Sequence, residues 1–232
     1  MLQVSKARQT DDTYKRGMLG HAKSTFASSE PTLPPDFRII MKRTINFCGD
    51  SFCAWIGSAK TPSWGDHVIK DLNLKLIGTG KASTAYEYAI KSFNPNADIT
   101  VFCWTSAQRL YHKDYISNYQ TGVLKLPSYK RSEILSITAE IFYREFYSKQ
   151  YFNTLQMRSL YWFDKEVLPK YKGLAIHLFC FEKTYHFENG INVDHILHST
   201  ANYEKSYPCH FDEKTNKWFA DKIFNVISEY ES

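Results

Sequence analysis

The chain has 232 residues, of which 43% are hydrophobic and 23% charged, a balance typical of a folded protein and not of a disordered one. Its formal net charge is only +5 and no run of five like charges occurs, so we expect no nucleic-acid partner. No stretch approaches the roughly 18 apolar residues of a membrane span. The first residues also lack the apolar core of a secretory signal, and we therefore expect a cytoplasmic or virion-associated protein without a signal peptide.

Five cysteines are present, an odd number in a chain large enough to build its own core. Cys48 and Cys103 stand at the ends of apolar runs, which predicts buried, reduced thiols. Because no Cys-x-x-Cys pair occurs, a structural zinc site has little support, and we expect neither a metal nor a cofactor.

Residues 1–40 differ in character from the rest. They are polar, contain the proline-bearing stretches 28–31 and 34–36, and show no sustained apolar period. We expect an extended arm, either a simple tail or a docking segment for another protein, attached to one domain of residues 41–232.

From residue 41 onward, expected strands and helices alternate. A strand over 43–48 leads to helical turns over 52–56 and a helix over 64–72. A strand over 74–77, a helix over 83–93 and a continuously apolar strand over 99–104 follow. A long helix over 132–160, a strand over 174–181 and a closing helix over 216–230 complete the pattern. This alternation predicts an α/β protein, a three-layer α/β/α sandwich with a mostly parallel central sheet.

Small and polar residues follow the first three expected strands. They are Gly49-Asp50-Ser51, Gly78-Thr79-Gly80 and Trp104-Thr105-Ser106. Ligands of parallel sheets bind at the carboxyl ends of the strands, so these segments are candidates for a site. His210 stands shortly before the last helix.

These segments resemble a known family. Residues 47–52 (Phe-Cys-Gly-Asp-Ser-Phe) are similar to the first block of the SGNH (GDSL-type) hydrolases, and residues 210–220 are similar to the last block. Gly80 falls at the place of the second-block glycine and residues 98–109 at that of the third block. The Trp-Thr-Ser ending resembles divergent members of the phage type. The resemblance covers residues 43–230 and implies a flavodoxin-like fold.

The resemblance implies a catalytic serine and histidine, and the chemistry of the residues agrees with it. A serine hydroxyl needs a neighbouring base, and histidine suits this task near neutral pH. We expect Ser51 to be the nucleophile and His210 the base. The backbone N–H groups of Ser51 and Gly80 would form the oxyanion hole, with glycine at 80 leaving room for the substrate carbonyl.

Two positions depart from the family pattern. The third block lacks its asparagine, so a hydroxyl of Thr105 or Ser106 would have to supply that donor. The aspartate expected three residues before the histidine is replaced by Tyr207. Either a Ser–His dyad operates with a backbone carbonyl orienting His210, or another acid such as Asp194 reaches the histidine. Asp212 is better placed to start the last helix.

Other candidates have plainer interpretations. His177 lies within an expected strand and is predicted to be a core or sheet-face histidine. His186, His195 and His198 are expected to be solvated loop residues and not metal ligands. The aromatic segments 142–147 and 161–163 are expected to form core and lid, with a carbohydrate-stacking face as the alternative.

We therefore expect a serine esterase that acts on small acyl esters of a carbohydrate or lipid through Ser51 and His210. The alternative is a catalytically impaired protein of the same fold, with a structural or attachment role in a larger assembly such as a virion. The near-intact first and last blocks favour the enzyme, and the two departures favour the alternative.

Overall fold

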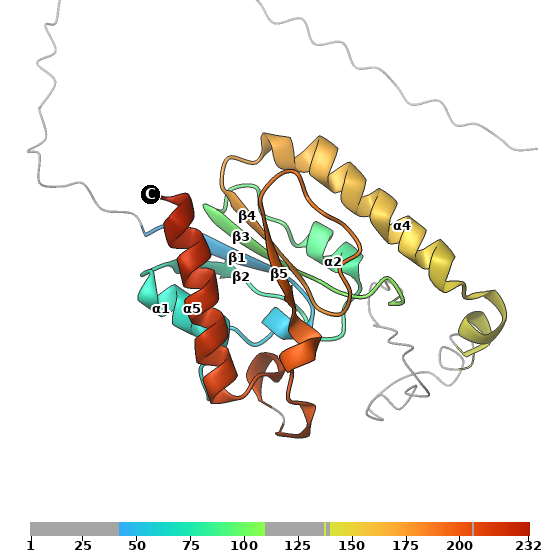
Figure 1. Cartoon of the computed structure of the whole chain (residues 1–232), viewed down its shortest axis with the longest axis horizontal. Helices are drawn as coiled ribbons and strands as arrows, with labels where there is room; N and C mark the ends of the chain where they lie inside the picture. Colours follow the sequence, from blue (N-terminus) through green and yellow to red (C-terminus); the bar gives the residue numbers. More distant parts are fainter. Residues whose placement is uncertain (1–41, 110–136, 138–139, 206) are drawn as a thin grey trace, which may run out of the picture. The chain divides into compact units, whose positions relative to one another are not determined.

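Five parallel strands form one sheet in the order β2-β1-β3-β4-β5 (Figure 1). The computed structural model describes residues 42–109, 137, 140–205 and 207–232, so the expected arm of residues 1–40 lies outside the described residues. The strands are β1 (Thr44–Gly49), β2 (Lys75–Gly78), β3 (Ile99–Trp104), β4 (Leu174–Phe179) and β5 (Ile191–Ile196). The chain changes direction across the sheet between β1 and β3, which is where ligands bind in sheets of this order.

Helices cover both faces of the sheet, which confirms the predicted three-layer α/β/α architecture (Figure 1). α1 (Trp64–Asp71) and α5 (Glu213–Tyr230) pack together on one face. α2 (Tyr86–Lys91) and α4 (Lys149–Trp162) belong to the other. Short helical turns connect these elements, at Ser51–Cys53, Phe142–Phe146, Phe163–Val167, Leu168–Lys170, Leu197–Thr200, Tyr203–Lys205 and Pro208–His210.

Polar side chains fix where the two helices α1 and α5 begin. Asp212 caps α5 by accepting the N–H of Thr215 at 2.8 Å, which confirms its predicted role at the helix start. Asn216 then joins the two helices, since its Oδ1 accepts the N–H of Trp64 at 2.8 Å and its Nδ2 donates to Phe211 O at 2.7 Å. This buried amide places the segment before α5 against the start of α1.

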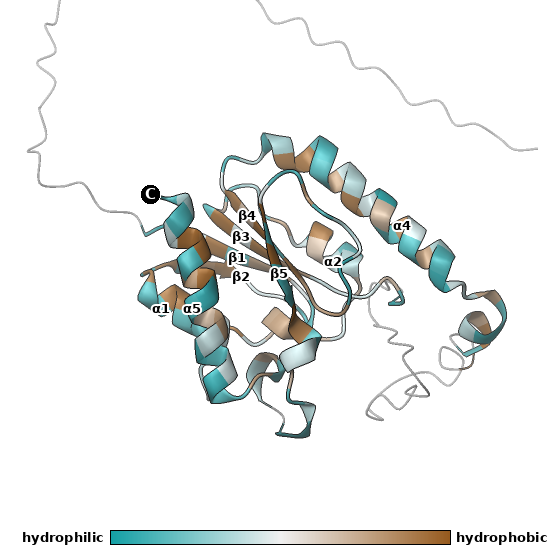
Figure 2. Ribbon diagram, viewed as in Figure 1, coloured by the Kyte–Doolittle hydropathy of each residue, from teal (hydrophilic) through white to brown (hydrophobic). Residues whose placement is uncertain are grey.

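The sheet separates two apolar layers, and its central strands are the most hydrophobic part of the ribbon (Figure 2). Phe47 and Phe219 pack edge-on against Trp64 in the layer under α1 and α5. The opposite layer is built from stacked rings, including Phe102 and Trp104 with centroids 5.0 Å apart. All five cysteines are free and buried, as predicted. In the part of the chain that the structure describes, no helix combines the length and apolar character of a membrane span.

His177 lies inside the stacked-ring layer and is completely buried, which confirms its prediction as a core residue. Its Nδ1 accepts the indole N–H of Trp104 at 3.2 Å, and its Nε2 lies 2.9 Å from Asn189 O. The proton must therefore be on Nε2, which donates to the carbonyl. Burial lowers the pKa of His177 to about 3.

Two elements differ from the sequence-based expectation. Residues 191–196 form the edge strand β5, because the ladder to β4 organises a segment whose polar residues suggested a loop. His195 consequently lies in a strand, half-buried against Trp218 at 5.2 Å, and is not a solvated loop residue. The long helix expected over 132–160 is interrupted within its described part, since Ser148 has an extended backbone and starts α4 by accepting the N–H of Tyr151.

The aromatic segments 142–147 and 161–163 divide between core and surface. Tyr143 and Phe163 are buried, whereas Phe146, Tyr161 and Trp162 are exposed. Tyr143 and Phe163 therefore contribute to the core as expected, and the three exposed rings do not.

The buried imidazole of His177 leads to a pH-dependent prediction. Its pKa in the folded chain lies below the ordinary value of about 6.5, so the unfolded state binds the proton more readily. The stabilisation is complete above pH 6.5 and falls as the pH drops towards 3, by at most about 1.4 kcal/mol per pH unit. Nitrogen-15 NMR should show a neutral His177 protonated at Nε2 at pH 5, and a titration near pH 6.5 would contradict the buried environment.

Candidate active site

Ser51 opens a tight turn directly after β1, at the point where the order of the strands changes direction. Asp50 caps this turn, since its Oδ1 accepts the N–H of Phe52 at 3.0 Å. Gly49 is required just before it, because a Cβ at this position would lie 2.4 Å from Cys103 O on β3. Ser51 is therefore presented at the carboxyl edge of the sheet by a turn that begins in contact with two central strands.

His210 ends a second turn, which has an unusual backbone. Cys209 and His210 both have positive φ angles, 54° and 66°, although neither is a glycine. Conformations of this kind cost on the order of 1–3 kcal/mol per residue and persist where the surroundings impose them. Here His210 N donates to Tyr207 O at 3.1 Å and His210 O accepts the N–H of Asn202 at 2.5 Å.

The structure brings these two turns together. The turn Ser51–Cys53 packs against the turn Pro208–His210, and the rings of Phe52 and His210 have centroids 5.0 Å apart. Within the described residues, Ser51 Oγ and the His210 ring make no hydrogen bond with each other. Catalytic hydrogen bonds are often long without substrate and tighten in the complex, so this arrangement is compatible with a Ser–His pair.

A buried ion pair between Arg109 and Asp50 holds the residue that caps the turn Ser51–Cys53. Arg109 Nη1 donates to Asp50 Oδ2 at 2.7 Å and to Thr84 O at 3.1 Å. The same guanidinium lies 5.0 Å from the centre of the Phe181 ring. Arg109 itself lies in the segment that follows β3. Its contacts connect this segment with the segments that follow β1, β2 and β4. This pair was not predicted from the sequence, although Asp50 directly precedes Ser51 and Arg109 ends the third-block segment 98–109.

A buried thiol contacts the same carboxylate. Cys180 Sγ lies 3.4 Å from Asp50 Oδ1, to which it donates. Burial is the main cause that raises the pKa values of Cys103 and Cys180 well above the usual range, and the charge of Asp50 adds to it. The thiols of Cys103 and Cys180 therefore stay protonated and carry no charge beside the Asp50 carboxylate.

The electrostatic surroundings keep His210 neutral near pH 7. Burial is the largest cause that lowers its pKa; the charge of Asp50 opposes this, and those of Arg109 and His198 add to it. Asp194, considered as a third triad member, instead forms an ion pair with Lys183 at 2.6 Å. Neither Asp194 nor the capping Asp212 therefore serves as a carboxylate partner of His210.

The role expected for Gly80 in the oxyanion hole needs correction. Its N–H donates to Cys53 O at 3.0 Å and so is not free to meet an oxyanion. A Cβ at position 80 would lie 2.5 Å from Cys53 Sγ and 2.8 Å from Gly49 O. Glycine is required because this loop crosses closely over the serine turn, and not because a substrate needs the room.

Thr105 and Ser106 differ in what their hydroxyls do. Both follow β3, and the pairing of Gly49 with Cys103 brings this strand end beside that of β1. Ser106 Oγ accepts the N–H of Gln108 at 3.2 Å. Thr105 Oγ1 is buried and has no hydrogen-bond partner, while its carbonyl accepts from Gln156 on α4 at 2.7 Å. Ser106 Oγ is thus held as an acceptor, whereas Thr105 Oγ1 is the one of the two hydroxyls that is buried without any partner.

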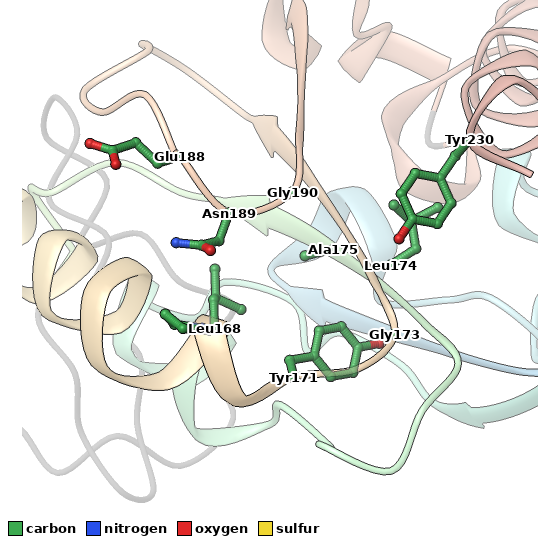
Figure 3. Close-up of a pocket in the computed structure, with 10 residues that line it drawn as sticks. Leu168, Tyr171, Gly173, Leu174, Ala175, Glu188, Asn189, Gly190 and Tyr230 are labelled. Atoms are coloured by element: carbon green, nitrogen blue, oxygen red, sulfur yellow. The ribbon is translucent and has the colours of Figure 1, made fainter.

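Two other kinds of site were considered, a metal site and a ligand cavity elsewhere on the sheet. Among the described residues, no group of three or more His, Cys, Asp or Glu side chains is arranged to hold a metal ion. A cavity of about 250 Å³ lies at the opposite end of the sheet, between the start of β4 and Tyr230 of α5 (Figure 3). Ligands of parallel sheets bind at the carboxyl ends, so we assign this cavity no part in the candidate site.

Comparisons with family models, with curated proteins and with solved structures gave no match.

The ion pair predicts a large and specific effect on stability. Replacing Arg109 by Met leaves Asp50 buried without its charge partner, which should lower the free energy of unfolding by about 3–5 kcal/mol. The double variant Asp50→Asn/Arg109→Met should recover much of this loss. Urea unfolding measures both, with Arg158→Met on the exposed surface of α4 as the matched control. Equal stability of Arg109→Met and the control would show that the pair contributes little.

Proposed function

We propose that the chain is a serine ester hydrolase of small acyl esters, with Ser51 as the nucleophile and His210 as the base. The observation that carries this proposal is the packing of the serine turn against the His210 turn at the carboxyl edge of the sheet. The resemblance of residues 47–52 and 210–220 to the SGNH hydrolases agrees with it. A carbohydrate or lipid ester is the expected substrate class.

The proposed reaction follows the chemistry of the two side chains. Ser51 Oγ attacks the ester carbonyl while His210 takes its proton, and the tetrahedral intermediate expels the alcohol, which receives that proton. Water then attacks the acyl-serine with His210 again acting as base, and the acid is released. A neutral imidazole is the form needed at the start, and the lowered pKa of His210 supplies it near pH 7.

Two donors are proposed for the oxyanion. Ser51 is the first residue of its turn, so its N–H is not used within the turn and can meet a substrate oxygen. The Thr105 hydroxyl is the second donor, because it is buried at the neighbouring strand end without a partner. Without a carboxylate on His210 we expect slow turnover, since removing the aspartate charge in a related triad costs on the order of 10⁴ in rate.

The direct test replaces the nucleophile and the base. Ser51→Ala should abolish hydrolysis of p-nitrophenyl acetate and labelling by a fluorophosphonate, and His210→Ala should do nearly the same because the pair acts as a unit. Ser58→Ala, an exposed serine of the following loop, is the matched control. For the unsubstituted chain, kcat/KM should rise with pH through a midpoint below 6.5 and level off near neutrality. Full activity in Ser51→Ala would refute the assignment, and a wild-type chain that neither hydrolyses nor labels would favour the structural alternative.

The Thr105 hydroxyl gives a second prediction, in which one substitution lowers the activity without lowering the stability. Thr105→Val removes a buried polar group that has no partner, so the free energy of unfolding should be unchanged or higher. Loss of an oxyanion donor should nevertheless lower kcat by about 10²–10³. Thermal unfolding and steady-state kinetics on the same preparation test this, with Ser106→Ala as the comparison. An unchanged kcat in Thr105→Val would remove Thr105 from the site.

A further inference from the structure

The ring of His210 is enclosed by three aromatic side chains. Its centroid lies 5.0 Å from that of Phe52, 4.7 Å from that of Tyr203 and 6.0 Å from that of Trp55. The interplanar angles are 65°, 40° and 88°, so the three rings pack on the imidazole from different directions. Ring packing of this kind restricts both the position and the tilt of the imidazole.

The three rings come from two segments on either side of the candidate site. Phe52 is fully buried beside Ser51, whereas Trp55 follows the serine turn and is 38% exposed. Tyr203 belongs to the turn Tyr203–Lys205 and is 47% exposed. Tyr203 is itself supported by His198, with ring centroids 5.3 Å apart. Trp55 and Tyr203 thus stand at the solvent edge of the site with one side against His210.

A general base must be held in one orientation, and serine triads do this with a carboxylate bonded to the histidine. Among the described residues, the His210 ring has no such hydrogen-bonded carboxylate, and position 207 holds a tyrosine. Its contacts are with rings, and the backbone around it is fixed by the bonds to Asn202 and Tyr207. The aromatic enclosure is therefore the part of the structure able to set the ring's orientation.

On the basis of the proposed esterase function, we propose that Trp55 and Tyr203 are positioning residues that hold the His210 imidazole towards Ser51 by ring packing, in place of a triad carboxylate. Phe52 supplies the buried wall, and the two exposed rings complete the enclosure.

The enclosure brings no charge of its own. Burial raises the pKa of the Tyr203 phenol to about 12, so this group is neutral at working pH. The charged and titratable groups that act on His210 are Asp50, Arg109 and His198, and none of these side chains is removed together with an exposed ring. Opening the enclosure therefore admits water to the imidazole, and the pKa of His210 should rise towards about 6.5.

The test separates ring packing from the other properties of the two residues. Tyr203→Leu and Trp55→Leu remove a ring, whereas Tyr203→Phe and Trp55→Phe keep one. We expect the leucine variants to lower kcat about 10- to 100-fold with little change in KM, and the phenylalanine variants to stay near wild type. NMR titration should show the His210 pKa rising in the leucine variants only. Trp218→Leu is the control, because this exposed ring contacts His195 and not His210.

The outcomes distinguish this proposal from the one on which it rests. If the wild type hydrolyses esters through Ser51 but both leucine variants keep kcat within about 2-fold and an unshifted His210 pKa, ring packing is not the positioning device and the esterase assignment stands. If the wild type shows no Ser51-dependent hydrolysis, the esterase assignment fails and the positioning role fails with it. Circular dichroism melts of each variant ensure that kcat is compared between folded proteins.

Discussion

The buried pair between Asp50 and Arg109 is the interaction on which the candidate site depends. One guanidinium nitrogen bonds both the carboxylate that caps the serine turn and the carbonyl of Thr84, and the group lies beside the ring of Phe181. Segments that follow four neighbouring strands are therefore connected through a single side chain. Removing one partner would leave a charge in the interior, which is far more costly than the pair itself is stabilising.

A second constraint acts on the other side of the site. The positive φ angles of Cys209 and His210 are maintained by hydrogen bonds to Tyr207 and Asn202, by the burial of Cys209, and by the cap of α5 that follows at Asp212. Because Asn216 attaches this region to α1, the His210 turn is fixed to the helical layer and the serine turn to the sheet. The candidate site is the place where these two rigid parts meet.

The general architecture followed from local patterns in the sequence. Apolar runs such as 99–104 and the helical spacing of 64–72 predicted the central strand and α1, because their side-chain periods do not depend on distant partners. The edge strand β5 and the interruption at Ser148 were not foreseen. Pairing with β4 decides the first, and the backbone at the cap of α4 decides the second. For the site, order along the chain was enough to nominate Ser51 and His210, but it assigned the wrong task to the N–H of Gly80.

By itself, then, the sequence determined the α/β class and the expected strand ends, and it nominated the two residues that we propose as nucleophile and base. Only the tertiary structure decided that Asp50 pairs with Arg109, 59 residues away, and that rings from residues 52, 55 and 203 surround His210. The physical reason is that side-chain periodicity is a local property of the chain. Ion pairs and ring contacts depend on which loops converge at one edge of the sheet, and that is settled by the order and register of the strands.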